Sequence, residues 1–543
     1  MTAVSTRELR THALARPRAD ALVAGAVVAL TLIGLAIRVA NFGQSLLGDE
    51  LSTYWIVHGH SLGHVLSSVR SNDEITPPLY FILGWASLKL GSSPEWLRLP
   101  SLVAGTATIP LIYLLGSRTV SRAAGLVAAA VMALSPFMIY YSTEARSYAL
   151  MILLLTCSTL ALLAALESGR ARWWVIYAIC SCGALYSHYT SLFPLAAQFA
   201  WVVWAHREAL RALLLANVGV LIGFAPWIPG FIADNNSPST NILSALQPFT
   251  FHAVRLAMEN WAIGYPYVTA GAVPGTAALR LIEGGLLLAL VAGAVRAWRW
   301  ARRSRVQPRA ALRRIPPGIV LVALLALATP VGEAIYSAVG TNLLGARNLN
   351  ASWPGLAIAF GAVVTAAGWP VVVACAALVL TGFGIGAAKT LQAEFARSDF
   401  AALANVIQER WEPGDVVVDG APFTPVPLTG LDTYLPQTHR EIRLGLPQVD
   451  HPFTPLDPRP SVPAQIDRAI KEARGHSLFL VSYLPRNSSL STASGLTQKR
   501  KLGYSAQRVL NRLPPSFEVR SWERFPGLSP LALVTIESRG RHG

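Results

Sequence analysis

The sequence has little charge and few cysteines, and both shortages restrict what the chain can be. Only 14% of its 543 residues are Asp, Glu, Lys or Arg, whereas soluble domains average about 25%. A soluble fold would also have to bury apolar runs such as Ala21–Ile37 and Val371–Ala388, which approach the ~20 residues that cross a bilayer. The four cysteines all lie inside apolar runs, which argues against a disulfide framework or a zinc site. The composition therefore predicts a polytopic α-helical membrane protein.

Acidic residues are scarcer than basic ones, but the basic excess does not indicate nucleic acid. The net charge is +16, yet the arginines cluster between apolar runs, as in short cytoplasmic loops. No basic groove interleaved with aromatic residues is visible. Four arginines precede the first run, Ala21–Ala40, which is too long for the apolar core of a signal peptide and lacks a small-residue cleavage site after it. We expect an uncleaved anchor with a cytoplasmic N-terminus.

The apolar runs predict about eleven membrane spans and one shorter helix. Segment Pro78–Leu90 has 13 residues, which suits a helix at the membrane interface better than a span. With that segment outside, the arginine-rich connections face the cytoplasm. If it crossed the membrane, they would face outward, against the positive-inside rule. The expected spans are 21–40, 97–116, 123–141, 148–166, 173–190, 191–206, 212–232, 278–297, 317–336, 350–368 and 370–388.

Beyond residue 390 the apolar runs become short and alternate with helical patterns, which is typical of a small α/β domain. We expect a transmembrane domain over 1–390, with the first extracytoplasmic loop at 41–96, and the α/β domain over 391–543. An odd number of spans after a cytoplasmic start places this domain outside the cytoplasm, on a cell membrane protein. The expected elements are a helix capped by Ser398 or Asp399 through Glu409, a strand at Val416–Val418, a helix at Ala464–Ala473, and strands at Leu478–Leu484 and Leu531–Ile536.

A second outward loop, Ala233–Thr276, is rich in aromatic residues. Aromatic side chains gather at membrane interfaces, but they could equally form a wall that binds an acceptor. The sequence leaves both interpretations open, and it also predicts an unstructured Pro-rich stretch over 421–463. The aromatic residues of the loop are Phe249, Phe251, Trp261, Tyr265 and Tyr267.

Three carboxylates are candidates for acid–base chemistry. Asp49 and Glu50 follow the first span directly, in Leu-Leu-Gly-Asp-Glu-Leu. Partial burial and mutual repulsion raise the pKa of such a pair toward the range of a general base, although an ordinary polar loop end would look the same. Glu144 precedes the fourth span, two residues before Arg146. Those two side chains could instead form a surface salt bridge, worth ~0–1 kcal/mol.

Three arginines and a histidine lie on the expected outward side, where the charge pattern disfavours cations. Arg98 begins the second span, Arg146 precedes the fourth, His188 ends the fifth and Arg347 begins the tenth. Arginine binds phosphate through paired N–H groups, and an ionisable residue in a span is a functional candidate. The alternatives are arginines that reach up to the membrane surface, a pair of Arg98 with Glu95, and a histidine satisfied by a neighbour.

The order of these features resembles the C-type glycosyltransferase superfamily, specifically the protein O-mannosyltransferases and aminoarabinose transferases. Over roughly the first 200 residues it comprises the acidic pair, the Pro-Pro helix, Glu-Trp-Leu-Arg-Leu-Pro-Ser and Tyr-Tyr-Ser-Thr-Glu-Ala-Arg-Ser-Tyr. The resemblance implies a polyprenyl-phosphate sugar donor, extracytoplasmic chemistry, Asp49 as base and Arg98 near the donor phosphate. The sequence departs from these families at Ile75-Thr76, where they carry Glu-Lys or a histidine, and it shows no β-trefoil repeats.

The sequence thus predicts a hexosyl- or pentosyltransferase that acts on a lipid or cell-envelope glycan acceptor. Asp49 would accept the proton of the attacking hydroxyl, and Arg98, Arg146 and Arg347 would stabilise the leaving phosphate. Attack opposite the phosphate inverts the anomeric centre.

No cofactor is established by the sequence. A divalent metal held by Asp49, Glu144 and His188 is conceivable, but their spacing gives it no support. The rival class is a lipid or glycan transporter or flippase. Transporters tend to show internal repeats and charges at the membrane midplane, whereas the charges noted here lie at the expected outer rim.

Overall fold

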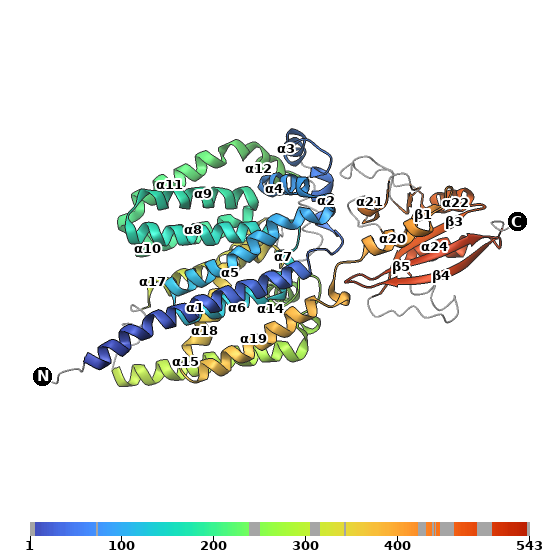
Figure 1. The fold of residues 1–543 in the computed structure, drawn as a ribbon. Helices are drawn as coiled ribbons and strands as arrows, with labels where there is room; N and C mark the ends of the chain where they lie inside the picture. The colour runs from blue at the N-terminus through green and yellow to red at the C-terminus, as the bar shows by residue number, and fades with distance from the viewer. Residues whose placement is uncertain are drawn as a thin grey trace. The chain divides into compact units, whose positions relative to one another are not determined.

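The structure is a computed structural model. It describes residues 6–71, 74–237, 250–304, 315–340, 344–421, 430–436, 439, 441–445, 461–485 and 502–539, with side chains from Asp20 onward. The ribbon contains a set of long helices and a sheet with helices beside it (Figure 1). The contacts divide the chain into two compact units. The first unit comprises Met1–Ala40, Leu66–Leu83 and Arg98–Lys389, and the second comprises Asn41–Val65, Gly84–Leu97 and Thr390–Gly543.

Eight helical segments among the described residues are long and apolar enough to cross a membrane. They make the chain a helical multi-pass membrane protein, as its composition predicts. The helices concerned are α1 (Thr6–Ala40), α5 (Leu99–Thr119), α8 (Tyr148–Ser168), α11 (Leu210–Phe224) with η5 (Ala225–Trp227) and α12 (Ile228–Asn235), α15 (Thr276–Ser304), α17 (Pro317–Val339), η7 (Asn348–Ser352) with α18 (Trp353–Ala366), and α19 (Val371–Thr390).

The other three predicted spans coincide with shorter helices. These are α6 (Arg122–Leu134), α9 (Ala171–Ser187) and α10 (Leu192–Ala205), of 13, 17 and 14 residues. The span expected over 123–141 is broken at Ser135, because the residue before a proline is driven out of the helical region and Pro136 starts a new helix, α7 (Pro136–Tyr141). The guanidinium of Arg38 donates to the carbonyl oxygens of Met132 and Ala133 next to this break.

The segment expected at the membrane interface is helical, as α4 (Leu79–Ser87) followed by η1 (Leu88–Leu90). At twelve residues it is an apolar helix shorter than the eight long ones. Its orientation toward the membrane stays a prediction. The neighbouring elements are α2 (Asp49–Val57), α3 (Leu62–Arg70) and η2 (Pro94–Arg98).

The aromatic segment expected as a loop over 233–276 is partly helical, which corrects that expectation. It contains α14 (Phe251–Ile263), which starts where the Thr250 hydroxyl accepts a hydrogen bond from the backbone N–H of Ala253, and η6 (Gly271–Gly275). Phe249 lies outside the described residues.

The aromatic residues of this segment differ in their surroundings. Tyr265 and Tyr267 pack edge-on against Tyr140, with ring centroids 5.3 and 5.2 Å apart. Trp261 is buried, whereas Phe251 is exposed. Tyr265 is therefore packed inside the protein beside α7, whereas Tyr267 and Phe251 both remain exposed.

The second unit contains a five-stranded mixed sheet with the order β2-β1-β3-β5-β4. The first three strands are parallel, and β5 runs antiparallel to both β3 and β4. The strands are β1 (Val416–Asp419), β2 (Glu441–Arg443), β3 (Ser477–Tyr483), β4 (Phe517–Phe525) and β5 (Leu531–Ser538).

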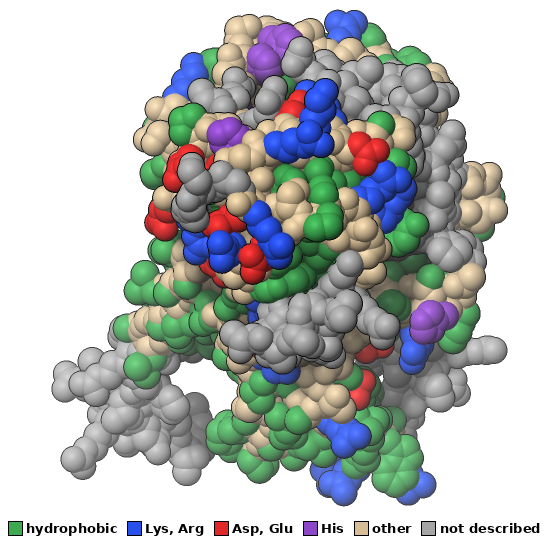
Figure 2. Space-filling model, turned by 90° about the vertical axis from the view of Figure 1, so that its right-hand side faces the viewer, with side chains coloured by type: hydrophobic (Ala, Val, Ile, Leu, Met, Phe, Trp, Pro, Cys, Tyr) green, Lys and Arg blue, Asp and Glu red, His purple; other side chains and the backbone are tan. Residues whose placement is uncertain are grey.

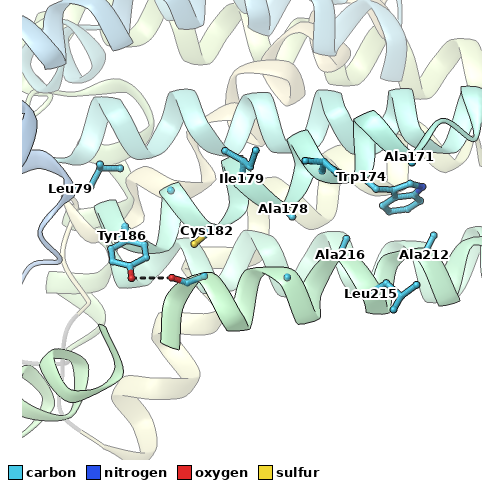
Figure 3. A pocket seen from close by; sticks show the side chains of 14 residues that line it. Leu79, Ala171, Trp174, Ala178, Ile179, Cys182, Tyr186, Ala212, Leu215 and Ala216 are labelled. Atoms are coloured by element: carbon cyan, nitrogen blue, oxygen red, sulfur yellow. Dashed lines mark hydrogen bonds between the residues drawn. The ribbon is translucent and has the colours of Figure 1, made fainter. Parts of the chain in front are cut away.

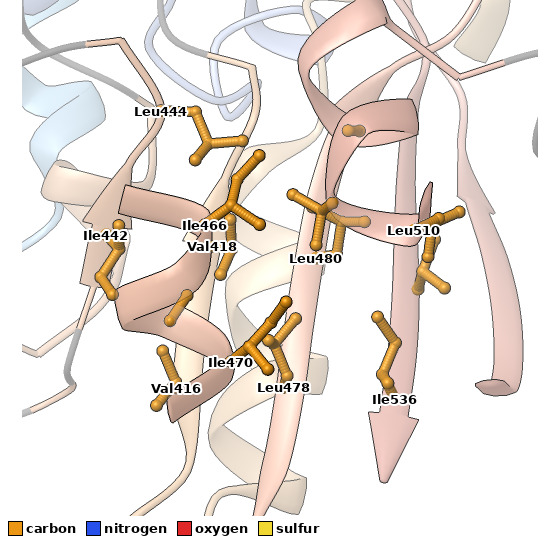
Figure 4. Close-up of a cluster of buried hydrophobic side chains, with 14 of the residues drawn as sticks. Val416, Val418, Ile442, Leu444, Ile466, Ile470, Leu478, Leu480, Leu510 and Ile536 are labelled. Atoms are coloured by element: carbon orange, nitrogen blue, oxygen red, sulfur yellow. The ribbon is translucent and has the colours of Figure 1, made fainter. Parts of the chain in front are cut away.

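Helices cover both faces of this sheet, because alternate strand residues point to opposite sides. Val416 and Val418 pack with α22 (Val462–Glu472) and α24 (Tyr504–Arg512) in the cluster drawn in Figure 4. Val417 lies in the other cluster, with α20 (Phe400–Arg410) and α21 (Leu431–Tyr434). The domain is therefore a three-layer α/β/α sandwich, and the expected C-terminal α/β domain is confirmed.

The charged strand β4 was missed by the sequence analysis. Its sequence, Phe-Glu-Val-Arg-Ser-Trp-Glu-Arg-Phe, mixes charged and apolar residues. The strand lies at the edge of the sheet. Charged side chains on an edge strand hinder pairing with another chain. Basic and acidic side chains lie side by side on the face shown in Figure 2. Surface ion pairs of this region include Arg410–Glu523 and Arg520–Glu537. The stretch expected as loop over 421–463 contains α21 and β2, and many of its other residues lie outside the described ones.

Candidate active site

The short connection between α7 and α8 is buried. It runs from Ser142 to Ser147 and carries Glu144 and Arg146, both almost inaccessible. The hydroxyl of Ser101, on α5, lies 3.0 Å from the backbone carbonyl of Arg146 and 2.9 Å from the hydroxyl of Tyr80, on α4. Two charged side chains are thus held inside the protein where α4, α5 and α8 meet.

Arg146 forms a bidentate ion pair with Glu74. Its Nη1 donates to Oε2 of Glu74 at 2.6 Å and its Nη2 donates to Oε1 at 3.1 Å. Nη2 also donates to the hydroxyl of Thr76 at 3.0 Å. The side chains of both ion-pair members are only 9% exposed. In this structure the guanidinium fork of Arg146 is thus engaged by the side chains of Glu74 and Thr76.

The pair of Arg146 with Glu74 adds a partner that the sequence interpretations, Glu144 or a donor phosphate, did not include. Sequence reasoning did not single out Glu74, because it lies 72 residues away in a polar stretch. One signal was available: Glu74 stands directly before Ile75-Thr76, where the sequence departs from the resembling families. The hydroxyl of Thr76 also donates to Oε1 of Glu74 at 3.0 Å. This segment therefore supplies a carboxylate in place of a cation.

His188 follows the last residue of α9. Its Nδ1 accepts a hydrogen bond from the backbone N–H of Thr190 at 3.3 Å and lies 2.9 Å from that residue's hydroxyl. Because Nδ1 is the acceptor in this contact, the ring proton is assigned to Nε2.

Arg98 and Arg347 are the other two arginines that the sequence analysis singled out as phosphate candidates. Arg98 is fully buried at the junction of η2 and α5. It precedes Ser101 by three residues, so the two side chains share one side of the helix start. Arg347 lies just before η7, and its backbone carbonyl accepts hydrogen bonds from Asn350. Its charge acts on His188, which places Arg347 in the same region as Arg146.

A second buried acid in this unit also escaped the sequence analysis. Asp234, at the end of α12, accepts a hydrogen bond from the hydroxyl of Tyr189. That hydroxyl in turn accepts one from the indole N–H of Trp227 at 2.9 Å. Asp234 also interacts electrostatically with Glu74. The described part of the first unit thus balances its buried cations with buried carboxylates.

No group of three or more His, Cys, Asp or Glu side chains in the described ranges is arranged to hold a metal ion. Glu74 is committed to Arg146 and Asp234 to Tyr189. The geometry therefore supplies no set of ligands for a divalent metal, and no step of the chemistry is assigned to one.

The two acidic residues of the first loop, Asp49 and Glu50, differ in their burial. Asp49 is the first residue of α2 and is partly exposed. It follows Gly48, whose φ of 63° is the left-handed conformation that glycine adopts readily. A carboxylate at a helix N-terminus is stabilised in its charged form by the helix dipole. Asp49 is therefore a partly exposed carboxylate at the N-terminus of a helix.

Glu50 is fully buried and faces the other way. Its Oε2 accepts a hydrogen bond from the backbone N–H of Leu47 at 3.3 Å and lies 3.2 Å from Nε of Arg397. These contacts tie the Glu50 carboxylate to the backbone of its own turn and to Arg397. Arg397 was not singled out from the sequence, since it lies 347 residues further along the chain.

An apolar groove of about 740 Å³ runs between α9 and α11 (Figure 3). Tyr186 stands at one end, with its hydroxyl donating to the carbonyl oxygen of Gly223 at 3.0 Å. The groove has no ionisable side chain except the thiol of Cys182 and the phenol of Tyr186, so it suits a hydrocarbon chain. It is lined by Leu79, Ala171, Trp174, Val175, Ala178, Ile179, Cys182, Gly183, Tyr186, Ala212, Leu215, Ala216, Gly219 and Gly223.

Buried arginines beside a multi-pass helical scaffold indicate an enzyme that handles an anionic, membrane-borne substrate. Residues 76–230 match a family model described as dolichyl-phosphate-mannose-protein mannosyltransferase. This match confirms the family resemblance drawn from the sequence and the class of enzyme, a glycosyltransferase. The matched segment contains Arg98, Glu144, Arg146 and His188.

Solved structures of two such proteins resemble the chain at low identity. A crystal structure of ArnT from Cupriavidus metallidurans bound to undecaprenyl phosphate has 14% identity and a TM-score of 0.48, covering 94% of this chain and 98% of that one. The archaeal oligosaccharyltransferase AglB from Archaeoglobus fulgidus, in complex with an inhibitory peptide and a dolichol-phosphate, has 13% identity and a TM-score of 0.41, covering 72% of this chain and 58% of that one. A search of curated proteins finds no match to the chain.

Proposed function

We propose that this protein transfers a sugar from a polyprenyl-phosphate donor to a lipid or cell-envelope glycan on the extracytoplasmic side of the cell membrane. The observation that carries the proposal is the family match over residues 76–230, because this segment holds the two buried arginines Arg98 and Arg146. The leaving group in such a transfer is a lipid phosphate. Its developing negative charge needs fixed cations or N–H donors in a site that excludes water.

The described contacts give the candidate cations different proposed roles. Arg146 is held by Glu74 and contributes its charge and the rigidity of its connection. Arg98 and Arg347 are the residues proposed to donate to the phosphate oxygens, and His188 can add one neutral N–H from Nε2. The apolar groove between α9 and α11 is suited to a hydrocarbon tail, which a polyprenyl donor brings with it.

Asp49 is proposed as the base. The acceptor oxygen attacks the anomeric carbon while the bond from that carbon to the phosphate oxygen breaks, and the hydroxyl proton passes to the Asp49 carboxylate. The electron pair of the broken bond leaves with the lipid phosphate, which needs no proton. Attack from the opposite face inverts the anomeric centre. Glu144 is the competing candidate for the base.

The orientation belongs to the same proposal. The N-terminus is cytoplasmic, Pro78–Leu90 lies outside without crossing, and the α/β domain is extracytoplasmic. A periplasm-dependent reporter fused after Ser538 should be active, and cysteines introduced across 70–95 should react with an impermeant thiol reagent added outside. Labelling of position 92 only from the cytoplasm would overturn the orientation.

One observation favours a different class, a lipid transporter. Glu333 is buried inside α17, one of the eight long apolar helices, and ionisable residues within spans are frequent in transport pathways. The full-length protein in lipid nanodiscs, given polyprenyl-phosphate [¹⁴C]mannose and an envelope lipid extract, distinguishes the two classes. A glycosyltransferase releases polyprenyl phosphate and labels an acceptor. A transporter leaves the donor intact.

A further inference from the structure

We propose that the C-terminal α/β domain positions the catalytic segment of the first loop, with Arg397 and Tyr434 as the positioning residues. The inference rests on the proposed function, in which Asp49 is the base and Arg98 binds the donor phosphate. The evidence lies within the second compact unit, which joins Asn41–Val65 and Gly84–Leu97 to the sheet domain. Four sets of contacts connect these distant parts of the chain.

The first set centres on Arg397, which is almost fully buried. Its Nε lies 3.2 Å from the carboxylate of Glu50. Its backbone N–H donates to Oε1 of Gln44 at 3.0 Å, and its Nη1 lies 3.4 Å from the same oxygen. Because Glu50 also accepts from the backbone of Leu47, Arg397 fixes the turn from Gln44 to Glu50 at both ends. Asp49 is part of that turn.

The second set is a shared helix cap at the start of α20. The N–H of Ala402 donates to Asp399 Oδ1 at 3.0 Å, and the N–H of Ala401 donates to the Ser45 hydroxyl at 3.0 Å. The Ser45 hydroxyl also lies 3.4 Å from the Asp399 carboxylate. A residue of the first loop therefore satisfies one of the unpaired N–H groups of a helix in the sheet domain. Both partners would lose hydrogen bonds if they separated.

The third set runs through Tyr434, at the end of α21. Its hydroxyl accepts a hydrogen bond from the backbone N–H of Leu46 and donates to Oε1 of Glu95, both at 2.8 Å. Glu95 and Arg98 belong to the same short helix, η2. One hydroxyl of the sheet domain thus ties the segment before Asp49 to the segment that carries Arg98. Neither link would be expected of a domain that only binds an acceptor.

The fourth contact is apolar. Leu47 packs against the cluster that lies between α20 and the sheet. This apolar contact lies beside the polar links of the same turn. The loop that carries Asp49 is built onto the domain's own core.

The positioning role predicts a specific effect on catalysis. A displacement of about 1 Å at a reacting group can lower the rate by on the order of 100-fold. Arg397→Met keeps the apolar stem but removes the guanidinium, so kcat should fall by at least ~10-fold while the affinity for polyprenyl phosphate stays within about twofold of the native value. Tyr434→Phe should also lower kcat, by a smaller factor than Arg397→Met.

A pH profile separates positioning from simple damage to the fold. In Arg397→Met the Glu50 carboxylate has lost its cation next to Asp49, and a neighbouring negative charge favours the protonated form of a carboxyl group. The acidic limb of the profile for kcat/KM should therefore move to higher pH. The double variant Glu50→Gln with Arg397→Met removes that charge and should return the limb to its native position. Structural damage alone would give no such rescue.

The experiment uses the full chain in nanodiscs with polyprenyl-phosphate [¹⁴C]mannose and envelope lipid extract. Arg512→Met and Tyr504→Phe are the matched controls, because both side chains are exposed on α24 of the same domain, and both should retain native kcat. If Arg397→Met does not fold, Tyr434→Phe and Glu50→Gln carry the test through the same readouts. Native kcat and an unmoved pH limb in folded variants, with Asp49→Asn inactive, overturn the positioning inference alone. Native activity of Asp49→Asn overturns the proposed function instead.

Discussion

Two buried ion pairs, one in each compact unit, hold the residues proposed for catalysis in different ways. Arg146 and Glu74 form a bidentate pair through two N–H groups. Arg397 and Glu50 meet through a single Nε contact, while Glu50 also binds the backbone of its own turn. In the first pair both N–H groups of the arginine fork are engaged by Glu74. The second pair consumes the buried member of an acidic pair and leaves Asp49 as the accessible one.

The comparison shows that charged residues close together in the sequence can have different partners and different burial in the fold. Asp49 and Glu50 look equivalent by composition, as do Glu144 and Arg146 by spacing. Long-range partners, Arg397 and Glu74, decide which of them is available to a substrate. The following predictions test that division of roles, from the largest expected effect to the smallest.

The largest effect on stability should come from removing one member of the bidentate pair. Arg146→Met leaves the Glu74 carboxylate buried without its cation, and breaking a buried pair in this way costs ~3–5 kcal/mol. Arg122→Met is the control, since its pair with Asp20 has side chains 65% and 56% exposed and such pairs contribute ~0–1 kcal/mol. Denaturant unfolding in detergent micelles measures both. Equal midpoints would show that the Arg146 pair contributes no more than a surface pair.

The next effect concerns the two arginines whose forks are assigned to the donor. Arg98→Ala and Arg347→Ala should each weaken binding of polyprenyl-phosphate mannose by ~1.5–3 kcal/mol, the value of a hydrogen bond to a charged group. Lysine at either position should restore only part of the affinity, because it lacks the paired N–H groups. Microscale binding titrations in nanodiscs give the values. Unchanged affinity in both alanine variants would remove these residues from the site.

A smaller effect should follow loss of the cap at α20. Asp399→Ala removes the acceptor of the Ala402 N–H and should lower stability by ~0.5–2 kcal/mol. Asp399→Asn keeps an acceptor there and should cost only a small part of that. The comparison is made by thermal unfolding of the two variants beside the native protein. A stronger loss in Asp399→Asn than in Asp399→Ala would contradict the capping role.

The smallest effect is expected at His188. Its Nδ1 accepts a hydrogen bond from the backbone N–H of Thr190, so we expect the folded protein to keep this ring neutral between pH 5 and 8. The affinity for the donor should therefore depend on pH in the same way in the native protein and in His188→Gln over that range. The donor is a phosphodiester, which does not titrate there. A change of affinity near pH 6.5 that disappears in His188→Gln would show that the ring is a titrating cation after all.

Sequence patterns determined much of the fold, because their signals are local. Apolar runs located the helices, and the cap at Asp399 was visible because the capping residue adjoins its helix. Strand β4 escaped because its edge position allows charged residues, and the break at Ser135 escaped because Pro136 was read as part of one continuous apolar run. Glu74 and Arg397 could not be predicted from the sequence, since their functions depend on partners 72 and 347 residues away.

From the sequence, the candidate site could be predicted only as far as the residue types indicate a chemical role. Arginines and carboxylates on the expected outer side were evident from the charge pattern. Which carboxylate is buried, which arginine is paired with protein and which ring nitrogen of His188 carries the proton are all set by tertiary contacts. The division of the first loop between two compact units is likewise invisible in a linear pattern.

The most direct test of the central claim is single-turnover transfer from polyprenyl-phosphate [¹⁴C]mannose by native protein and by Asp49→Asn, with Glu144→Gln beside them. A positioned base contributes ~10²–10⁴-fold, and the amide keeps the shape of the carboxylate. Asp49→Asn should bind donor normally and lose at least ~100-fold in rate, while Glu144→Gln retains turnover. Normal turnover by Asp49→Asn with an inactive Glu144→Gln would move the base to Glu144. Native protein that leaves the donor intact with every envelope acceptor would contradict the glycosyltransferase account.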